Sequence, residues 1–411
     1  MTSSYREGNE KMVVIVNGLR TAIGKYGGSL ANTAPDEMFA VLIRNNLSSC
    51  GYDGSIIDEV IVGHTKQSAH YPNIARVAAL KAGLDVSIPA YTVHRQCGSG
   101  MQAVLNGYMA IRLGMAEAII AGGVENMSQA PYYFTGNRQG IPPGNLVLYD
   151  SNTESQYKSQ PEDQFGSFNM GETAEYLAEK YGISRQEQDE FACASQMKAV
   201  RAVESDRFSD EIVPMEISPG KGQTALFTKD EFPRPDTSLE KLAKLKPVFK
   251  PGGTVTAGNS SGRNDGAASL LLMKEDKARS LEIRPMARIV AISVAAVHPK
   301  EMGLGPVPAV RKALQQAGLT LNDIGLIELN EAFAAQSIAV LKELGLYNEK
   351  DMQRLNVNGG AIALGHPIGC SGARILVTLI HEMRKRNVRY GLATLCVAGG
   401  MGMATIVENI D

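Results

Sequence analysis

The chain has 411 residues, of which 44% are hydrophobic and 20% are charged, and its formal net charge at pH 7 is −2. These values are typical of a globular protein with two or three domains, and they argue against a dedicated nucleic-acid-binding protein, whose surface would be basic. No apolar run approaches the roughly 20 residues of a membrane-spanning helix, so neither a nucleic acid nor a membrane is expected as a partner.

The five cysteines are widely spaced and form no C-x-x-C pair, so we expect neither a zinc site nor a disulfide framework. The polar segment Met1–Lys11 lacks the apolar core of a signal peptide, and the last residues, Glu408–Asp411, carry no peroxisomal or ER address. A reducing compartment, the cytoplasm, is therefore the expected location.

The first part of the chain alternates apolar runs with amphipathic segments. Strands are expected at Val13–Val16, Asp58–Gly63, Ile88–Val93 and Ala118–Ala121, and helices from about Asp36, over Asn73–Ala82 and from Met101 onward. This alternation predicts an α/β fold with a mostly parallel sheet.

The character of the sequence changes between Pro131 and Lys250. Residues Thr135–Phe168 are polar and show no periodicity, which predicts a long loop of functional or interaction character. Amphipathic helices are expected over Thr173–Lys180 and Gln186–Ser205. We interpret this segment as an insertion that covers the α/β body.

The last part of the chain repeats motifs of the first. Gly369–Ala373 resembles Cys97–Met101, and Ala398–Gly400 resembles Ala121–Gly123, with room for one helix between the two motifs each time. The common order favours two copies of one α/β unit.

Cys97 lies where a predicted strand ends and a predicted helix begins. Free N–H groups and the positive end of the helix dipole at such a position stabilise a thiolate and lower the pKa of the thiol. A buried structural cysteine beside a tight turn is the alternative interpretation, and this stretch by itself does not decide between them.

Three later stretches set polar groups next to apolar segments: Asn330, His366 in a Gly-His-Pro turn, and Cys396. Acyl transfer fits them, with a cysteine nucleophile, a histidine base, backbone N–H groups at the oxyanion, and a second thiol of near-neutral pKa that moves a proton. The alternatives are a structural His366, a small buried Cys396, and an Asn330 that caps a helix over Glu331–Leu344.

Together these motifs resemble the thiolase family over Arg20–Gly402, nearly the whole chain. The matching stretches, in family order, are Arg20–Gly28, Cys97–Met101, Gly122–Ser128, Gly253–Gly262, Asn330–Phe333, Asn358–Gly369 and Leu395–Gly402.

The resemblance implies a thiolase-like α/β fold, in which two similar halves form a layered αβαβα body with an inserted loop domain. The N-terminal half would comprise residues 1–130 plus about 251–283, the inserted loop domain over the CoA site residues 131–250, and the C-terminal half residues 284–411.

The resemblance also implies a reaction in which Cys97, activated by His366, takes the acyl group of a 3-ketoacyl-CoA and passes it to a second CoA. Cys396 would exchange a proton with the methyl group of acetyl-CoA. Asn330, through a water and with His366, would form one oxyanion hole, and the N–H groups of Cys97 and Ala398 the other.

For the CoA substrate, the resemblance places Arg234 near the nucleotide, Phe249, Ala257 and Ser261 along the pantetheine, and Met170 near the acyl pocket. No metal and no cofactor are implied beyond CoA as substrate, and the implied assembly is a homodimer or a homotetramer formed through the Thr135–Phe168 loop.

Four positions depart from the pattern usual in the family. His94 replaces an asparagine, Ala398 a glycine, Arg263 an apolar residue, and Asn169 the histidine that acetoacetyl-specific relatives often carry. A positive φ at Ala398 would cost about 1 kcal/mol or more. Asn169 leaves the acyl chain length open.

We therefore expect an acetyl-CoA C-acyltransferase that acts on acetoacetyl-CoA, in both the cleavage and the condensation direction. One alternative is a 3-ketoacyl-CoA thiolase of fatty-acid β-oxidation with a broader range of chain lengths. Another, from a different class of protein, is an acyl-CoA-binding relative that has lost its activity.

Overall fold

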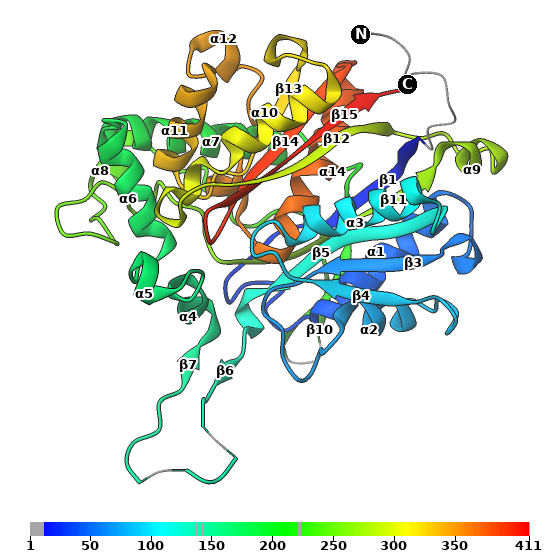
Figure 1. Ribbon diagram of the computed structural model, residues 1–411, viewed down its shortest axis with the longest axis horizontal. Coiled ribbons are helices and arrows are strands. Elements are labelled where there is room, and N and C mark those ends of the chain that lie inside the picture. The colour runs from blue at the N-terminus through cyan, green and yellow to red at the C-terminus, as the bar shows by residue number, and fades with distance from the viewer. Residues whose placement is uncertain (1–11, 137, 142, 221–222, 411) are drawn as a thin grey trace.

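The computed structural model describes residues 12–136, 138–141, 143–220 and 223–410, shown in Figure 1. The segment Met1–Lys11, on which the expected absence of a signal peptide rests, lies outside these residues. In the described part, no helix is long and apolar enough to cross a membrane.

A mixed sheet of 11 strands runs through the described part of the molecule. Nine of these strands form one path, in the order β13 (Leu326–Leu329), β14 (Tyr390–Val397), β15 (Met401–Asn409), β12 (Ala287–Ala296), β1 (Val13–Thr21), β11 (Asn264–Lys274), β5 (Ala118–Asn126), β3 (Glu59–Gly63) and β4 (Ala90–Val93). The pairs β3–β4, β3–β5 and β13–β14 are parallel, whereas every ladder from β5 through β11, β1, β12 and β15 to β14 is antiparallel.

The prediction of a mostly parallel sheet is therefore wrong. β15 follows β14 through the tight turn at Ala398–Gly400, and such a turn can only join antiparallel neighbours. β11 returns after the inserted segment and pairs antiparallel with both β1 and β5.

The layered αβαβα body that the family resemblance implies is confirmed. The helices α3 (Ser99–Leu113) and α14 (Ile368–Arg386) pack in the middle, against both groups of strands. The outer layers are α1 (Pro35–Ser49) and α2 (Ile74–Lys81) on one side, and α10 (Pro306–Ala317) and α11 (Ala334–Leu344) on the other. Within the described residues, only the short pairing of β1 with β12, at Val14–Arg288 and Ile15–Ala287, joins one group of strands (β4, β3, β5, β11 and β1) to the other (β12, β15, β14 and β13).

Each strand contributes side chains to two hydrophobic cores, one on each face of the sheet, because successive side chains point to opposite faces. In β3, Ile61 packs in the central core, while Val60 and Val62 pack under α1 and α2. In β14, Leu395 faces the central core and Leu392 faces α10 and α11. Both strands are buried almost throughout because helices cover both of their faces.

The segment after β5 differs from the predicted structureless loop. It contains a two-stranded arm, β6 (Tyr132–Tyr133) and β7 (Tyr149–Asp150), and two short helices, α4 (Ser151–Tyr157) and α5 (Glu162–Phe165). Asp150 caps α4 with its carboxylate, a local signal that hydrophobic periodicity does not contain. Figure 1 shows the arm projecting away from the layered body.

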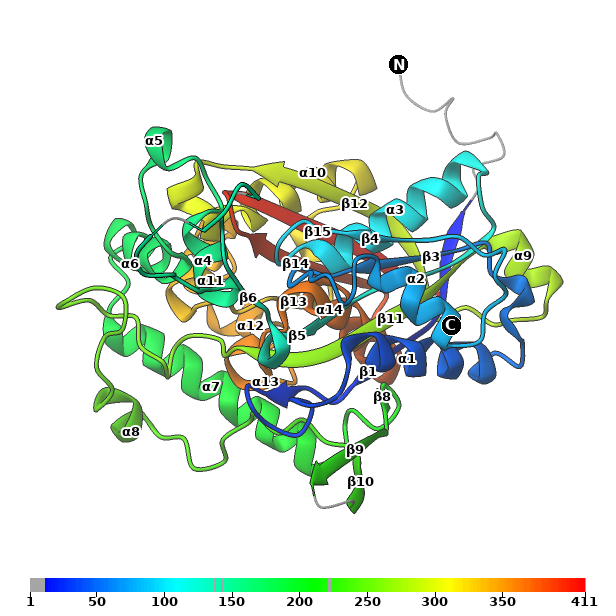
Figure 2. The same ribbon diagram turned by 90° about the horizontal axis from the view of Figure 1, so that it is seen from below.

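The predicted helices of the insertion are present as α6 (Met170–Lys180) and α7 (Arg185–Glu204). Each begins with a capping box, Asn169 with Glu172 and Ser184 with Glu187. Both helices contact α11, and Figure 2 shows them with α8 (Leu239–Ala243) beside the C-terminal half. The smaller elements are β2 (Gly24–Lys25), β8 (Ile212–Val213), β9 (Met215–Gly220), β10 (Gln223–Phe227), α9 (Glu275–Ser280), α12 (Glu349–Met352) and α13 (Ala361–Leu364).

Candidate active site

Cys97 lies between the end of β4 at Val93 and the start of α3 at Ser99, as the sequence predicts. The turn is fixed by Ser99, whose Oγ accepts from the Arg95 N–H at 2.8 Å and donates to the Gln96 carbonyl at 2.6 Å. Gln96 has a φ of +45°, a conformation that non-glycine residues rarely adopt. This turn places Cys97 at a cavity that His366, Cys396 and Ala398 also line.

The prediction that the helix N-terminus lowers the pKa of Cys97 is wrong for the free protein. Burial raises the pKa of the Cys97 thiol to about 11, although hydrogen bonds from the backbone N–H groups of Ala398 and Cys97 and the charge of Lys66 act in the opposite direction. The thiol is therefore protonated at neutral pH, and a nucleophilic Cys97 needs a base.

His366 has the form that such a base needs. Its Nδ1 lies 2.6 Å from the Oγ of Ser371, and that hydroxyl already donates its proton to the Pro367 carbonyl at 2.9 Å. Nδ1 must therefore carry the ring proton, which leaves Nε2 with a free lone pair. Within the described residues, this buried Nε2 has no hydrogen-bond partner. Burial and the charge of Arg374 lower the pKa of His366 to about 4, so that the ring is neutral at pH 7.

Cys396 lies near the end of β14 and is buried. Burial raises the pKa of its thiol, and the neighbouring Cys97 raises it further, so the near-neutral pKa expected from the sequence is not found in the free protein. A protonated Cys396 beside Cys97 is suited to donate a proton to a carbanion.

Ala398 follows Cys396 in the turn between β14 and β15. The left-handed conformations of this turn fall on Gly399 and Gly400, with φ values of +88° and +82°, and Ala398 does not share them. The backbone cost expected for Ala398 therefore does not arise, and its N–H is directed at the sulfur of Cys97.

Asn330 is fully buried after β13, and neither Oδ1 nor Nδ2 has a hydrogen-bond partner within the described residues. The alternative that it caps the following helix is wrong, because α11 begins at Ala334 and Phe333 occupies the cap position. An amide with both polar atoms free and buried fits a site for a water or an oxyanion.

The cavity has a volume of about 330 Å³ and brings together most of the predicted site residues. These are Cys97, Met170, Phe249, Ser261, His366, Cys396 and Ala398. Arg234 and Ala257 instead line a separate cavity of about 140 Å³, together with Gln196 and Phe232. Asn330 lines neither.

Two of the four residues that depart from the family pattern, His94 and Asn169, do not line the cavity. His94 is exposed, and Asn169 is occupied as the cap of α6, with its Nδ2 donating to the Tyr157 hydroxyl at 3.0 Å. Arg263, by contrast, lines the cavity.

Glu125 is a buried residue beside the site whose importance no local pattern indicates. Its buried carboxylate accepts from the N–H of Gly369 at 2.8 Å and from the N–H of Lys66 at 3.0 Å, and it pairs with His64 at 3.0 Å. Burial alone would raise the pKa of Glu125, but His64 and Thr65 lower it to about 2. The carboxylate thereby ties the loop that carries His366 to the end of β3.

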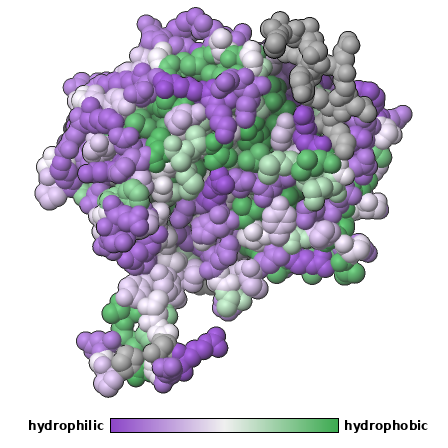
Figure 3. Space-filling model, in the orientation of Figure 1, coloured by the Kyte–Doolittle hydropathy of each residue, from purple (hydrophilic) through white to green (hydrophobic). Residues whose placement is uncertain are grey.

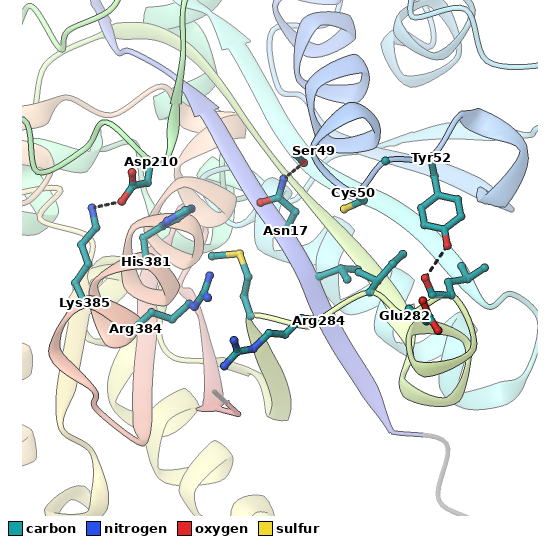
Figure 4. A pocket seen from close by; sticks show the side chains of 15 residues that line it. Asn17, Ser49, Cys50, Tyr52, Asp210, Glu282, Arg284, His381, Arg384 and Lys385 are labelled. Carbon is teal, nitrogen blue, oxygen red and sulfur yellow. Dashed lines mark hydrogen bonds and ion pairs between the residues drawn. The ribbon is translucent and has the colours of Figure 1, made fainter.

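A larger cavity of about 1000 Å³ lies elsewhere, between β1, the end of α1 and α14, as Figure 4 shows. None of the predicted site residues lines it. Its polar groups include Lys385, which pairs with Asp210 at 3.1 Å, and His381, whose Nε2 contacts the Gly18 carbonyl oxygen at 2.8 Å.

Comparison with known proteins agrees with this geometry. Residues 13–276 match the model of the thiolase N-terminal domain, and residues 283–409 match that of the thiolase C-terminal domain. An acetyl-CoA acetyltransferase of Pseudomonas aeruginosa is 52% identical over 392 residues, which cover 95% of this chain and 98% of that protein. An acetyl-CoA acetyltransferase of Escherichia coli is 47% identical over 98% of this chain and its own full length.

Two solved structures are also similar. The Bacillus anthracis acetyl-CoA acetyltransferase matches with a TM-score of 0.93 and 46% identity, over 98% of this chain and 100% of that chain. Human mitochondrial 3-ketoacyl-CoA thiolase in complex with CoA matches with a TM-score of 0.91 and 41% identity, over 97% and 98% of the two chains. The chain therefore belongs to the thiolase family.

Proposed function

We propose that the protein catalyses the CoA-dependent cleavage of 3-ketoacyl-CoA, with acetoacetyl-CoA as a substrate, and the reverse condensation of acetyl-CoA. The observation that carries this proposal is the meeting of two thiols, Cys97 and Cys396, with the free Nε2 of His366 in one cavity. The names of the similar bacterial proteins, acetyl-CoA acetyltransferase, support acetoacetyl-CoA as the substrate.

In the first half of the reaction, His366 Nε2 takes the proton of Cys97, and the thiolate attacks the keto carbon. The N–H groups of Cys97 and Ala398 stabilise the oxyanion that forms when the keto carbon becomes bonded to Cys97. Asn330 and His366 stabilise the negative charge on the thioester oxygen of the departing acetyl-CoA. The carbon–carbon bond then breaks, and Cys396 protonates the carbanion to give acetyl-CoA.

In the second half, the Cys396 thiolate takes the proton of an incoming CoA thiol. The CoA sulfur attacks the acyl group on Cys97, and the bond between the acyl carbon and Cys97 breaks. His366 returns its proton to the Cys97 sulfur, so that every group regains its starting state.

The apolar part of the cavity suits the pantetheine arm of CoA. Phe249 and Phe333 pack edge to face with ring centroids 5.9 Å apart, and Met170, which we assign to the acyl end, lines the same cavity. We assign Arg234, which lines the separate cavity of about 140 Å³, to the phosphates of the nucleotide, because a guanidinium suits phosphate recognition.

The test is cleavage of 3-ketoacyl-CoA substrates of increasing chain length, followed as loss of the 3-ketoacyl absorbance. Fast turnover confined to acetoacetyl-CoA supports the proposal, whereas similar rates on longer chains support the broader β-oxidation thiolase. Cys97→Ala should abolish turnover, and Cys193→Ala should not, because Cys193 lies on α7 outside the cavity lining. No cleavage by the wild type would favour the acyl-CoA-binding alternative.

We further propose a cytoplasmic homodimer or homotetramer. The arm between Tyr132 and Asp150 exposes Ile141, Leu146, Val147 and Leu148 by 54–66% each. Figure 3 shows hydrophobic surface on this projection. Exposed apolar side chains on a projecting arm favour contact with another copy. Sedimentation measures the mass of the assembly. A variant with polar residues at these four positions should form a smaller assembly than the wild type.

A further inference from the structure

The cavity that holds Cys97 has a polar part as well as the apolar part assigned to pantetheine. Gln96, Ser155, Gln156, Ser159 and Arg263 line it. A methyl group, the only substituent that acetoacetyl-CoA presents beyond its keto carbon, needs no such groups. The polar lining offers hydrogen bonds that a polar acyl chain would use and a methyl group would not.

Most of the N–H donors of the Arg263 guanidinium have no partner within the described residues. Within the described residues, its guanidinium makes one hydrogen bond, from Nη2 to Thr153 Oγ1 at 3.1 Å, and one longer ion pair, from Nη1 to Asp150 at 3.6 Å. Its side chain is 39% exposed. Since a guanidinium carries five N–H donors, most of them are free for a ligand.

A second cation acts on both Arg263 and the nucleophile. The ammonium of Lys66 is held by the Ser151 carbonyl at 3.0 Å and by Ser155 Oγ at 2.8 Å, and its charge acts on both Cys97 and Arg263. The Cys97 sulfur and Arg263 therefore share the field of one buried ammonium.

Two carboxylates oppose these cations, and both have other partners. Asp150 accepts from the Asn152 N–H at 2.9 Å and from Thr153 Oγ1 at 2.8 Å as the cap of α4. Glu125 pairs with His64 and accepts from backbone N–H groups beneath the site. With Glu125 and His64 paired, the cluster of Lys66, Arg263 and Asp150 keeps one positive charge.

We propose that this cavity binds 3-ketoacyl-CoA substrates whose acyl chain ends in a carboxylate, with Arg263, from its polar part, as the group that pairs with that carboxylate. The inference rests on the proposed thiolase reaction and specifies its substrate class. Carboxylate recognition suits Arg263, because a guanidinium binds both carboxylate oxygens in one plane. The product of cleavage is then the CoA ester of a dicarboxylic acid, together with acetyl-CoA.

The experiment compares kcat/KM for carboxylate-terminated 3-ketoacyl-CoA thioesters with that for methyl-terminated thioesters of matched chain length. At one or more chain lengths, the wild type should prefer the carboxylate by about tenfold or more, since charge-assisted hydrogen bonds contribute that much. In Arg263→Leu this ratio should fall to near one, and in Arg263→Lys it should keep an intermediate value.

Arg279→Leu is the control for the loss of one positive charge, because Arg279 is 75% exposed on α9 and does not line the cavity; it should keep the wild-type ratio. A wild-type ratio near one at every length would overturn the proposal while leaving the thiolase function intact. An equal fall in kcat/KM for both substrates in Arg263→Leu would also overturn the proposal. That result is expected if Arg263 binds a phosphate of CoA or only holds α4 in place. Failure to cleave either substrate would instead refute the thiolase function itself.

Discussion

Removal of the Ser371 hydroxyl tests the argument that fixes the tautomer of His366. Ser371 is buried, and its Oγ is the acceptor for the Nδ1 proton of His366 at 2.6 Å. In Ser371→Ala this proton would have no acceptor, and an unsatisfied buried donor costs about 1–3 kcal/mol. The ring can avoid that cost by moving its proton to Nε2, but Nε2 then cannot accept the proton of Cys97.

The expected loss follows from this competition between tautomers. A penalty of about 1.4–2.8 kcal/mol on the productive tautomer lowers its population, and with it kcat, about tenfold to a hundredfold. The assay is steady-state cleavage of acetoacetyl-CoA, together with the rate at which iodoacetamide alkylates Cys97. Both rates should fall, while Ser371→Thr, which keeps a hydroxyl at the same position, should restore part of the loss.

Ser337→Ala is the matched control. Ser337 is also a buried helical serine, but its Oγ has no hydrogen-bond partner within the described residues, so its removal should change neither kcat nor the free energy of unfolding by much. Full activity in Ser371→Ala would refute the tautomer argument. An equal loss in the two alanine variants would show that the effect comes from packing and not from His366.

Three further outcomes are expected. Asn330→Ala should lower kcat about a hundredfold with little loss of stability, measured by cleavage kinetics and urea denaturation, because an oxyanion-hole donor is removed while no hydrogen bond within the described residues is lost. Because the pKa of His366 falls to about 4 on folding, the unfolded chain binds a proton at this residue between about pH 6.5 and pH 4 and the folded chain does not. The free energy of unfolding should therefore be independent of this group above about pH 6.5 and fall by about 3 kcal/mol toward pH 4, and His366→Gln should show a shallower fall in urea titrations across that range. Arg20→Met should destabilise the fold by about 3–5 kcal/mol in the same titrations, since it leaves Glu211 and Asp230, which pair with Arg20 at 2.6 and 2.7 Å, as buried carboxylates without their cation; an unchanged midpoint would contradict that account.

The sequence by itself determined the elements and the chemistry. The position of Cys97 between a strand and a helix follows from local apolar patterns, and the capping signals at Ser184 and Asn73 mark where α7 and α2 begin. The thiolase resemblance supplied the layered fold and the pairing of Cys97 with His366 and Cys396. These features are local, or are carried by short motifs in a fixed order.

Only the tertiary structure decided the direction of the strands, the ionisation of the site and the surroundings of Arg263. β11 pairs with β5 across the inserted segment, and no local pattern records whether such distant strands run parallel or antiparallel. The pKa of Cys97 rises, although the helix N-terminus predicts a fall, because burial depends on every element that covers the sulfur. The contacts of Arg263 with Asp150 and Thr153 likewise join residues about 110 positions apart. Sequence patterns report short-range preferences, whereas solvation and charge at a site are sums over neighbours that folding alone brings together.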